Sequence, residues 1–229
     1  AGGHGTAIAY NLAKYHGITD VAVLDKAYLG GGNTARNTAV IRSNYLTEKG
    51  IEFYRDSVRL FANLSNEFSY NVMFERRGQM TLAHSDAALR NFRWRAEMNS
   101  HFGVRSQMVD RQEVSELVPS LSMDEDARFP IVGGLWHRDG ATARHDAMVW
   151  GYMHGACKRG VELHQLTEVQ GIDINDGAVM GVQTNRGRVG CKIAVQAVAG
   201  CSSSVAQMAG IRLPIKTFPL QAMATQPYK

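Results

Sequence analysis

The chain has 229 residues, of which 45% are hydrophobic and 20% charged, so it can build one large domain or two small ones and is not a disordered segment. Its 25 basic and 21 acidic residues give a formal charge of +4 without a long basic run, which argues against nucleic-acid binding. The three cysteines form no CxxC pair and no run of about 18 apolar residues occurs, so we expect no disulfide framework, no zinc knuckle and no membrane span. These features predict a soluble, cytoplasmic protein.

The first residues predict a turn, a helix and a strand in that order. The glycine-rich residues 1–5 lead into apolar residues 7–13 at helical spacing, and this pattern ends at Gly17. The short apolar run 21–24 then predicts a buried strand that ends at Asp25. The chain starts without Met and stops just after a strand-like run, so we expect a fragment of a longer protein.

This order is typical of a dinucleotide-binding site. Gly2 and Gly5 fit the second and third glycines of a GxGxxG fingerprint, whose first glycine would precede the chain. Gly3 and His4 would present backbone N–H groups to a pyrophosphate at the helix N-terminus. Asp25 follows Gly5 by 20 residues, the spacing at which a carboxylate meets the ribose hydroxyls and disfavours the 2′-phosphate of NADP. The alternative is an ordinary turn that starts a helix.

The remaining pattern predicts an α/β protein with an inserted block. We expect a Rossmann-like dinucleotide-binding domain over 1–78 and 137–204, and a mixed-sheet α+β substrate domain over 79–136 and 205–229. The expected helices are 48–68, 86–99, 110–117 and about 145–159, and the expected strands lie within 74–83, 133–136, 164–169, 172–174, 179–184 and 192–199.

The glycine-rich loop 30–37 follows the acid-bearing strand closely and could contact a cofactor or be a solvated connection. Asn33 and Thr34 could donate or accept hydrogen bonds there, and Arg36 could pair with an anion. Arg42, after two apolar residues, could bind a carboxylate or be a surface charge. His145 lies between an arginine and an aspartate at a helix start, but a lone histidine is usually structural. We find no metal-binding spacing and no GxSxG elbow, so hydrolase chemistry has little support.

The chain resembles the β subunits of heterotetrameric sarcosine oxidases, in the D-amino-acid-oxidase-like flavoprotein superfamily. The resemblance covers nearly the whole chain. The segments that carry it are 2–5, 21–26, 31–38, 41–45, 70–74, 77–78, 144–146, 150–151 and 213–215.

The resemblance implies two flavins. FAD would be held without a covalent bond by Gly2, Gly3, His4, Gly5, Asp25, Asn33, Thr34, Arg36, Val169 and Gly200, and FMN would be attached covalently at His145. Arg36 and Arg144 would lie near the FMN, and Arg42 would hold the substrate carboxylate. The family's opening strand, its first glycine and the segment that follows Lys229 are absent from this sequence, which puts activity of this chain alone in doubt.

The implied reaction is the oxidation of sarcosine by hydride transfer to FAD. Electrons would pass through FMN to oxygen and give hydrogen peroxide, and the one-carbon unit would go to tetrahydrofolate on a partner subunit. One alternative is an oxidase or dehydrogenase of glycine, dimethylglycine or a D-amino acid that uses FAD alone. A second alternative is a flavin-binding subunit without catalytic activity.

Overall fold

The computed structural model describes residues 1–221, 223 and 225–227. The chain forms two compact units, one of residues 1–38 and 145–229 and one of residues 39–144. These boundaries differ from those expected from the sequence, because β2, β3 and β7 form one sheet within the second unit. Which unit holds cofactor and which holds substrate stays a prediction, and part of the expected range 205–229 lies outside the described residues.

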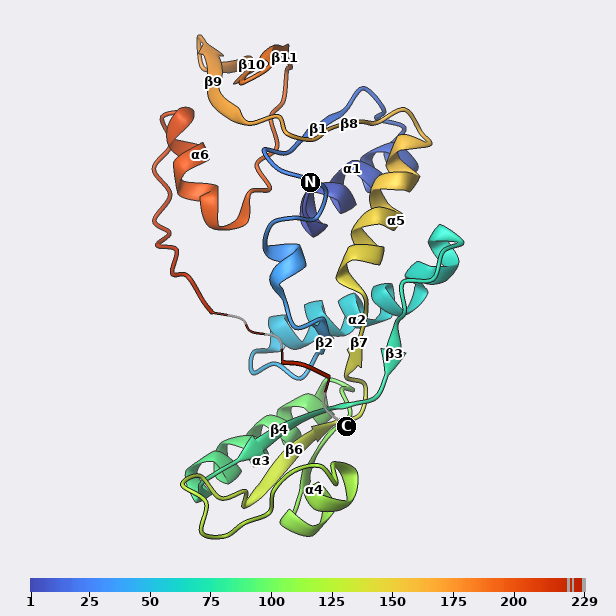
Figure 1. Ribbon diagram of the computed structural model, residues 1–229, viewed down its shortest axis with the longest axis vertical. Helices are drawn as coiled ribbons and strands as arrows, with labels where there is room; N and C mark the ends of the chain where they lie inside the picture. The colour runs from blue at the N-terminus through green and yellow to red at the C-terminus, as the bar shows by residue number, and fades with distance from the viewer. Residues whose placement is uncertain (222, 224, 228–229) are drawn as a thin grey trace. The chain divides into compact units, whose positions relative to one another are not determined.

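The first unit combines a parallel strand pair with helices (Figure 1). Helix α1 packs against α5, and a Cβ built at Gly3 would lie 3.5 Å from the Met148 side chain. Three antiparallel strands form a separate sheet in the order β11-β10-β9. In chain order the elements are α1 (Gly3–His16), β1 (Ala22–Leu24), η1 (Asn33–Arg36), α5 (His145–Cys157), β8 (Glu162–His164), β9 (Val169–Asn175), β10 (Ala178–Thr184), β11 (Gly187–Gly190), η2 (Ala199–Cys201) and α6 (Ser202–Met208).

The second unit contains two three-stranded antiparallel sheets, in the orders β2-β7-β3 and β4-β6-β5. In chain order its elements are β2 (Val40–Ile41), α2 (Glu48–Phe68), β3 (Glu75–Arg76), β4 (Gln79–Ala83), α3 (Asp86–His101), β5 (Ser106–Val109), α4 (Arg111–Leu117), β6 (Gly133–His137) and β7 (Ala141–Thr142).

Strand β6 is the central strand of the sheet β4-β6-β5, and its side chains pack against neighbours on both faces of that sheet. Trp136 packs against the apolar cluster of Val109, Val114 and Ile131, which includes the buried side chain of α4. The next residue, His137, points to the opposite face because side chains alternate along a strand. On that face Ser106 bridges to Asn99 of α3. The His137 side chain is therefore buried between its own sheet and α3.

Two strand predictions are wrong. Residues 165–168 form a turn between β8 and β9, because Leu166 takes a left-handed conformation with φ 53° and its N–H donates to the Ala27 carbonyl. Residues 192–198 are not a strand, and within the described part of the chain no strand pairs with them. Their apolar residues Ile193 and Val195 are 79% and 61% exposed. Alternating apolar residues form a strand only where a neighbouring strand supplies the hydrogen-bond ladder.

Candidate functional site

The N-terminus of α1 is closely approached by the glycine-rich loop. The Gly3 N–H donates to the Thr34 hydroxyl oxygen at 3.0 Å, and a Cβ built at Gly2 would lie 3.2 Å from that oxygen. The N–H groups of His4 and Gly5 lie in the first helical turn, where no intrahelical acceptor exists. The helix dipole places partial positive charge at this end. These groups can therefore bind an anion such as a pyrophosphate.

Asp25 lies at the end of β1 and is joined to the start of the chain. Its Oδ2 lies 2.7 Å from the backbone nitrogen of Ala1, and its Oδ1 accepts the Ala27 N–H at 2.8 Å. The carbonyl of Ala1 in turn accepts the Gly30 N–H at 2.9 Å. The structure thus brings Asp25, the glycine-rich loop and the start of α1 into one region, and the predicted contact of Asp25 with the ribose stays a prediction.

The three polar residues predicted in the loop lie in different surroundings. Thr34 faces the N-terminus of α1, whereas Asn33 is exposed at the first position of η1. The Arg36 guanidinium donates to the carbonyls of Gly31 at 2.6 Å and Gly32 at 3.0 Å, so it braces its own loop. Its pairing with a cofactor anion stays a prediction.

His145 is the first residue of α5 and lines a pocket of about 390 Å³. Within the described part of the chain, His145 Nδ1 is a buried side-chain nitrogen for which no hydrogen-bond partner exists. Leaving such an atom unsatisfied costs about 1–3 kcal/mol. The residues that line the pocket are Tyr28, Leu29, Gly30, Ala35, His145, Asp146, Trp150 and Gln165.

The loop connects this pocket with the N-terminus of α1. Gly30 and Ala35 line the pocket, while Thr34 contacts Gly3 on the other side. Two aromatic residues, Tyr28 and Trp150, and the imidazole of His145 give the pocket a shape and chemistry suited to a planar, partly apolar ring. The loop therefore contributes both to the lining of this pocket and to the surroundings of the α1 N-terminus.

Val169 is the first residue of β9 and pairs with Thr184 of β10. Two residues earlier, the Thr167 N–H donates to the backbone carbonyl of Asp25 at 2.8 Å. Val169 is thus connected through a short turn to the acid-bearing strand. Its predicted contact with the adenine stays a prediction.

Gly200 lies in η2, and its carbonyl accepts the Thr217 hydroxyl at 3.0 Å. The preceding segment contacts α1, since a Cβ built at Gly5 would lie 3.5 Å from the Ala197 Cβ. Gly200 is therefore close in sequence to a segment that packs against the first turn of α1. Its predicted role beside the cofactor also stays a prediction.

Arg42 and Arg144 belong to the second unit, whereas the other predicted site residues belong to the first. The Arg42 guanidinium donates to Asn44 Oδ1 at 3.2 Å and lies 4.6 Å from the ring centroid of Tyr45. Tyr45 stacks on Tyr54 with a centroid distance of 3.9 Å. Arg42 is half-buried in these polar and aromatic surroundings, and its binding of a substrate carboxylate stays a prediction.

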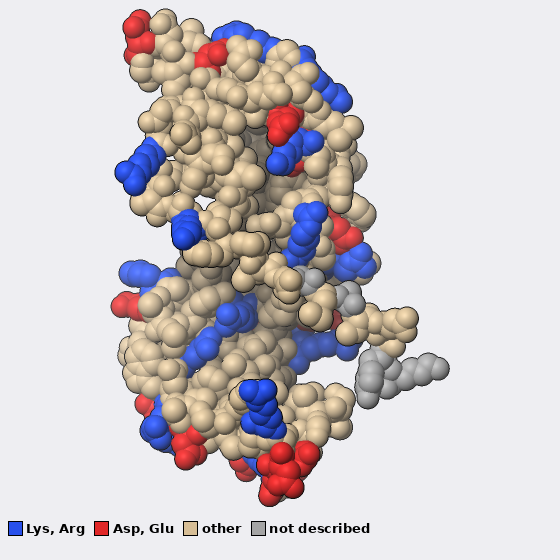
Figure 2. Space-filling model, turned by 60° about the vertical axis from the view of Figure 1, so that its left-hand side comes forward, with Lys and Arg blue, Asp and Glu red and all other residues tan. Residues whose placement is uncertain are grey.

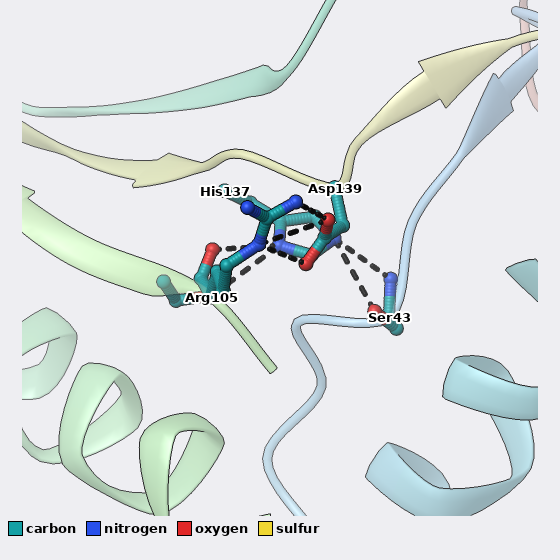
Figure 3. A network of polar contacts seen from close by, with 5 residues as sticks. Ser43, Arg105, His137 and Asp139 are labelled. Atoms are coloured by element: carbon teal, nitrogen blue, oxygen red, sulfur yellow. Dashed lines mark hydrogen bonds and ion pairs between the residues drawn. The ribbon is translucent and has the colours of Figure 1, made fainter. Parts of the chain in front are cut away.

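The sequence pattern did not single out His137, which is fully buried beside the segment that carries Arg42 (Figure 3). Its Nε2 lies 3.2 Å from the Ser43 N–H donor, and its Nδ1 lies 3.3 Å from the Arg105 carbonyl. Burial lowers the pKa of His137 below its ordinary value. The Arg105 guanidinium bonds to the Asp139 carboxylate, with 3.1 Å between Nε and Oδ2, and lowers the pKa of Asp139.

No group of three or more His, Cys, Asp or Glu residues that could hold a metal ion occurs among the described residues. On the face shown in Figure 2, Lys and Arg side chains form separate small groups among uncharged residues. No helix in the described ranges is long and apolar enough to cross a membrane.

Comparisons with known proteins identify the family of this chain. The family model described as "FAD dependent oxidoreductase" matches residues 1–229. The chain is 48% identical to sarcosine oxidase subunit beta of Rhizobium meliloti over 228 residues and 44% identical to that of Rhodobacter capsulatus over 229 residues. These alignments cover the whole of this chain and 55% of each relative, so the chain spans about half their length.

A solved structure, L-proline dehydrogenase from P. horikoshii, aligns with 94% of this chain and 55% of its own length. The TM-score is 0.83 and the sequence identity is 27%. The resemblance to the sarcosine oxidase β subunits therefore holds over the whole chain. The chain belongs to the family of FAD-dependent oxidoreductases.

Proposed function

We propose that the full-length protein is the β subunit of a heterotetrameric sarcosine oxidase. Its FAD is held without a covalent bond at the N-terminus of α1. The amides of His4 and Gly5 in the first helical turn suit the pyrophosphate, and Asp25, which lies in the same region, suits the ribose hydroxyls. A Cβ built at Gly2 would lie 3.2 Å from the Thr34 hydroxyl oxygen, so a glycine at this position lets the glycine-rich loop approach the start of α1 closely.

We propose that FMN is attached covalently to His145. The observation that carries this proposal is the buried Nδ1 without a hydrogen-bond partner, in a pocket that also holds Tyr28 and Trp150. An unprotonated imidazole nitrogen is a nucleophile and can bond to an electrophilic carbon of a flavin. The cost of leaving this ring unsatisfied is removed when a ligand fills the pocket.

Arg42 binds the carboxylate of the substrate in this proposal. Its guanidinium is oriented by Asn44 and Tyr45 and can form charge-assisted hydrogen bonds to a carboxylate. The bound flavins would supply a hydride acceptor for the N-methyl carbon of sarcosine and a path for electrons to oxygen, so that an imine and hydrogen peroxide form. The one-carbon unit passes to tetrahydrofolate on a partner subunit, and the complex works in the cytoplasm as part of one-carbon metabolism.

The attachment at His145 is tested by acid precipitation of the full-length complex, followed by mass spectrometry of the peptide that contains His145. We expect a yellow pellet and a flavin adduct on this peptide. The variant His145→Ala should lose the adduct. The variant His154→Ala, which changes an exposed histidine of the same helix, should keep it. A colourless pellet would instead favour an enzyme that uses FAD alone on glycine, dimethylglycine or a D-amino acid.

The reaction itself is tested by mixing the full-length complex with sarcosine under anaerobic conditions in a stopped-flow instrument. Rapid loss of the oxidised FAD absorbance is expected. Absence of bleaching in a complex that contains both flavins would contradict the catalytic proposal and favour a flavin-binding subunit without catalytic activity.

A further inference from the structure

The segment of residues 42–45 is a buried loop. It follows the short strand β2, and its residues Ser43 and Asn44 are only 2% and 0% exposed. Buried backbone groups outside helices and sheets must find hydrogen-bond partners elsewhere, because an unpaired group is costly. Most loops avoid this cost by lying at the surface. A loop held in the interior by dedicated side chains is therefore fixed in one conformation.

Helix α3 supplies side chains that hold the second half of this segment. Arg95 donates from Nε to the Asn44 carbonyl at 2.6 Å. One turn along the helix, Asn99 donates from Nδ2 to the Tyr45 carbonyl at 2.9 Å. Arg95 is half-buried, and burial followed by the nearby Arg42 charge lowers its pKa. Two successive carbonyls of the loop are thus fixed to one helix.

Strand β6 holds the first half through His137 (Figure 3). A backbone N–H can only donate, so the contact from Ser43 makes His137 Nε2 an acceptor and leaves that nitrogen without a proton. The ring proton then lies on Nδ1, where it can be donated to the Arg105 carbonyl. His137 must be neutral for both bonds to form.

This bond bears directly on Arg42. The peptide plane between Arg42 and Ser43 contains the Ser43 N–H that His137 accepts. On the other side of Arg42, Ile41 is fixed by its pairing with Ala141 in the β2-β7 ladder. Arg42 is therefore the single residue between two anchored peptide groups, and the direction of its side chain depends on both.

We propose that His137 is a positioning residue that orients Arg42 toward the substrate carboxylate. The inference rests on the proposed function, in which Arg42 binds that carboxylate. Protonation of His137 would place two N–H donors against each other at Ser43 and break the backbone bond, because Nε2–H would then donate to the Ser43 hydroxyl oxygen, 3.3 Å away, in its place. The charged groups that face the ring are Asp139, which favours the protonated form, and Arg42 and Arg95, which disfavour it. Binding of a carboxylate should therefore weaken as His137 becomes protonated at acid pH.

Two substitutions separate the contacts of His137. In His137→Gln, the side-chain oxygen can reach the position of Nε2 and accept the Ser43 N–H. In His137→Asn, the shorter amide can keep the bond to the Arg105 carbonyl but cannot reach Ser43. His101→Asn, an exposed histidine of the same unit, is the control. All variants are studied in the full-length complex with its flavins.

The readouts are the dissociation constant of acetate, followed through the flavin absorbance, and KM and kcat for sarcosine. For His137→Asn we expect the acetate constant and KM to rise about tenfold with kcat nearly unchanged, since one hydrogen bond that orients a charged group is lost. His137→Gln should stay close to the parent. If His137→Asn binds acetate normally while Arg42→Lys binds it weakly, the inference is wrong and the proposed function stands. If Arg42→Lys binds acetate normally, the role of Arg42 itself is wrong.

If the His137→Asn variant does not fold, a second measurement tests the inference without it. Acetate binding to the parent is measured from pH 8 down to pH 5.5 and compared with His137→Gln, which has no titratable group at this position. Weaker binding at acid pH in the parent alone supports the inference. The same pH dependence in both proteins overturns it.

Discussion

Gly78 is the position where the structure predicts a large effect from one methyl group. Its φ is 79°, and a Cβ built there would lie 1.9 Å from the Cη2 atom of Trp136. Trp136 packs against the apolar cluster of the second unit and precedes His137, so the ring has little room to move. The variant Gly78→Ala therefore combines a left-handed backbone penalty of about 1–2 kcal/mol with an overpacking cost of about 1–3 kcal/mol.

Gly103 provides the matched control. Its φ is 72°, but nothing lies within 4 Å of a Cβ built there, so Gly103→Ala should show the backbone penalty of about 1–2 kcal/mol alone. Urea denaturation of the full-length variants, compared at equal slopes, gives the two changes in free energy of unfolding. We expect Gly78→Ala to be the more destabilised by about 1–3 kcal/mol. Equal destabilisation of the two variants would refute the close contact between Gly78 and Trp136.

Three further predictions concern single contacts. Asp110→Ala removes a capping box in which the side chains of Asp110 and Glu113 accept each other's backbone N–H groups. The variant should have a free energy of unfolding about 1 kcal/mol lower in urea denaturation. An unchanged urea midpoint would contradict the cap. Asp25→Asn should weaken FAD retention about tenfold or more, measured by flavin release on dilution, because charge-assisted bonds to the ribose are lost; unchanged retention would place the ribose elsewhere. Since Arg105 lowers the pKa of Asp139, their pair stabilises the fold above the ordinary carboxyl pKa of about 4 and loses this effect as the pH falls through the lowered value. Arg105→Gln should therefore be less stable than the parent at pH 7 and equally stable near pH 2, and a constant difference across that range would refute the pair.

Helices with local end signals were predictable from the sequence. The predicted helix 48–68 agrees with α2 at both ends, because Thr47 caps the first turn by accepting the Gly50 N–H and Ser69 ends it in a left-handed conformation. The predicted helix 110–117 is confirmed as α4, which begins with a capping box formed by Asp110 and Glu113. These signals lie within a few residues of the helix ends, so a local pattern contains them.

The polar interior of the second unit could not be predicted in this way. His137 bonds to Ser43 across 94 residues of sequence, and no local pattern indicates that the two meet. The prediction of a strand over 192–199 is wrong because a strand needs a neighbouring strand to pair with, and alternating apolar residues do not show whether one is there. The sequence pattern alone does not distinguish His145 from the other histidines; the family resemblance does. The structure adds the pocket and the unpaired Nδ1.

An experimental structure of the full-length protein with its flavins tests the central claim most directly. We predict that the pyrophosphate of FAD accepts hydrogen bonds from the backbone amides at the start of α1, and that the Asp25 carboxylate accepts those of the adenosine ribose hydroxyls. A structure in which side chains fill the space before α1 and Asp25 points away from the cofactor would contradict the account.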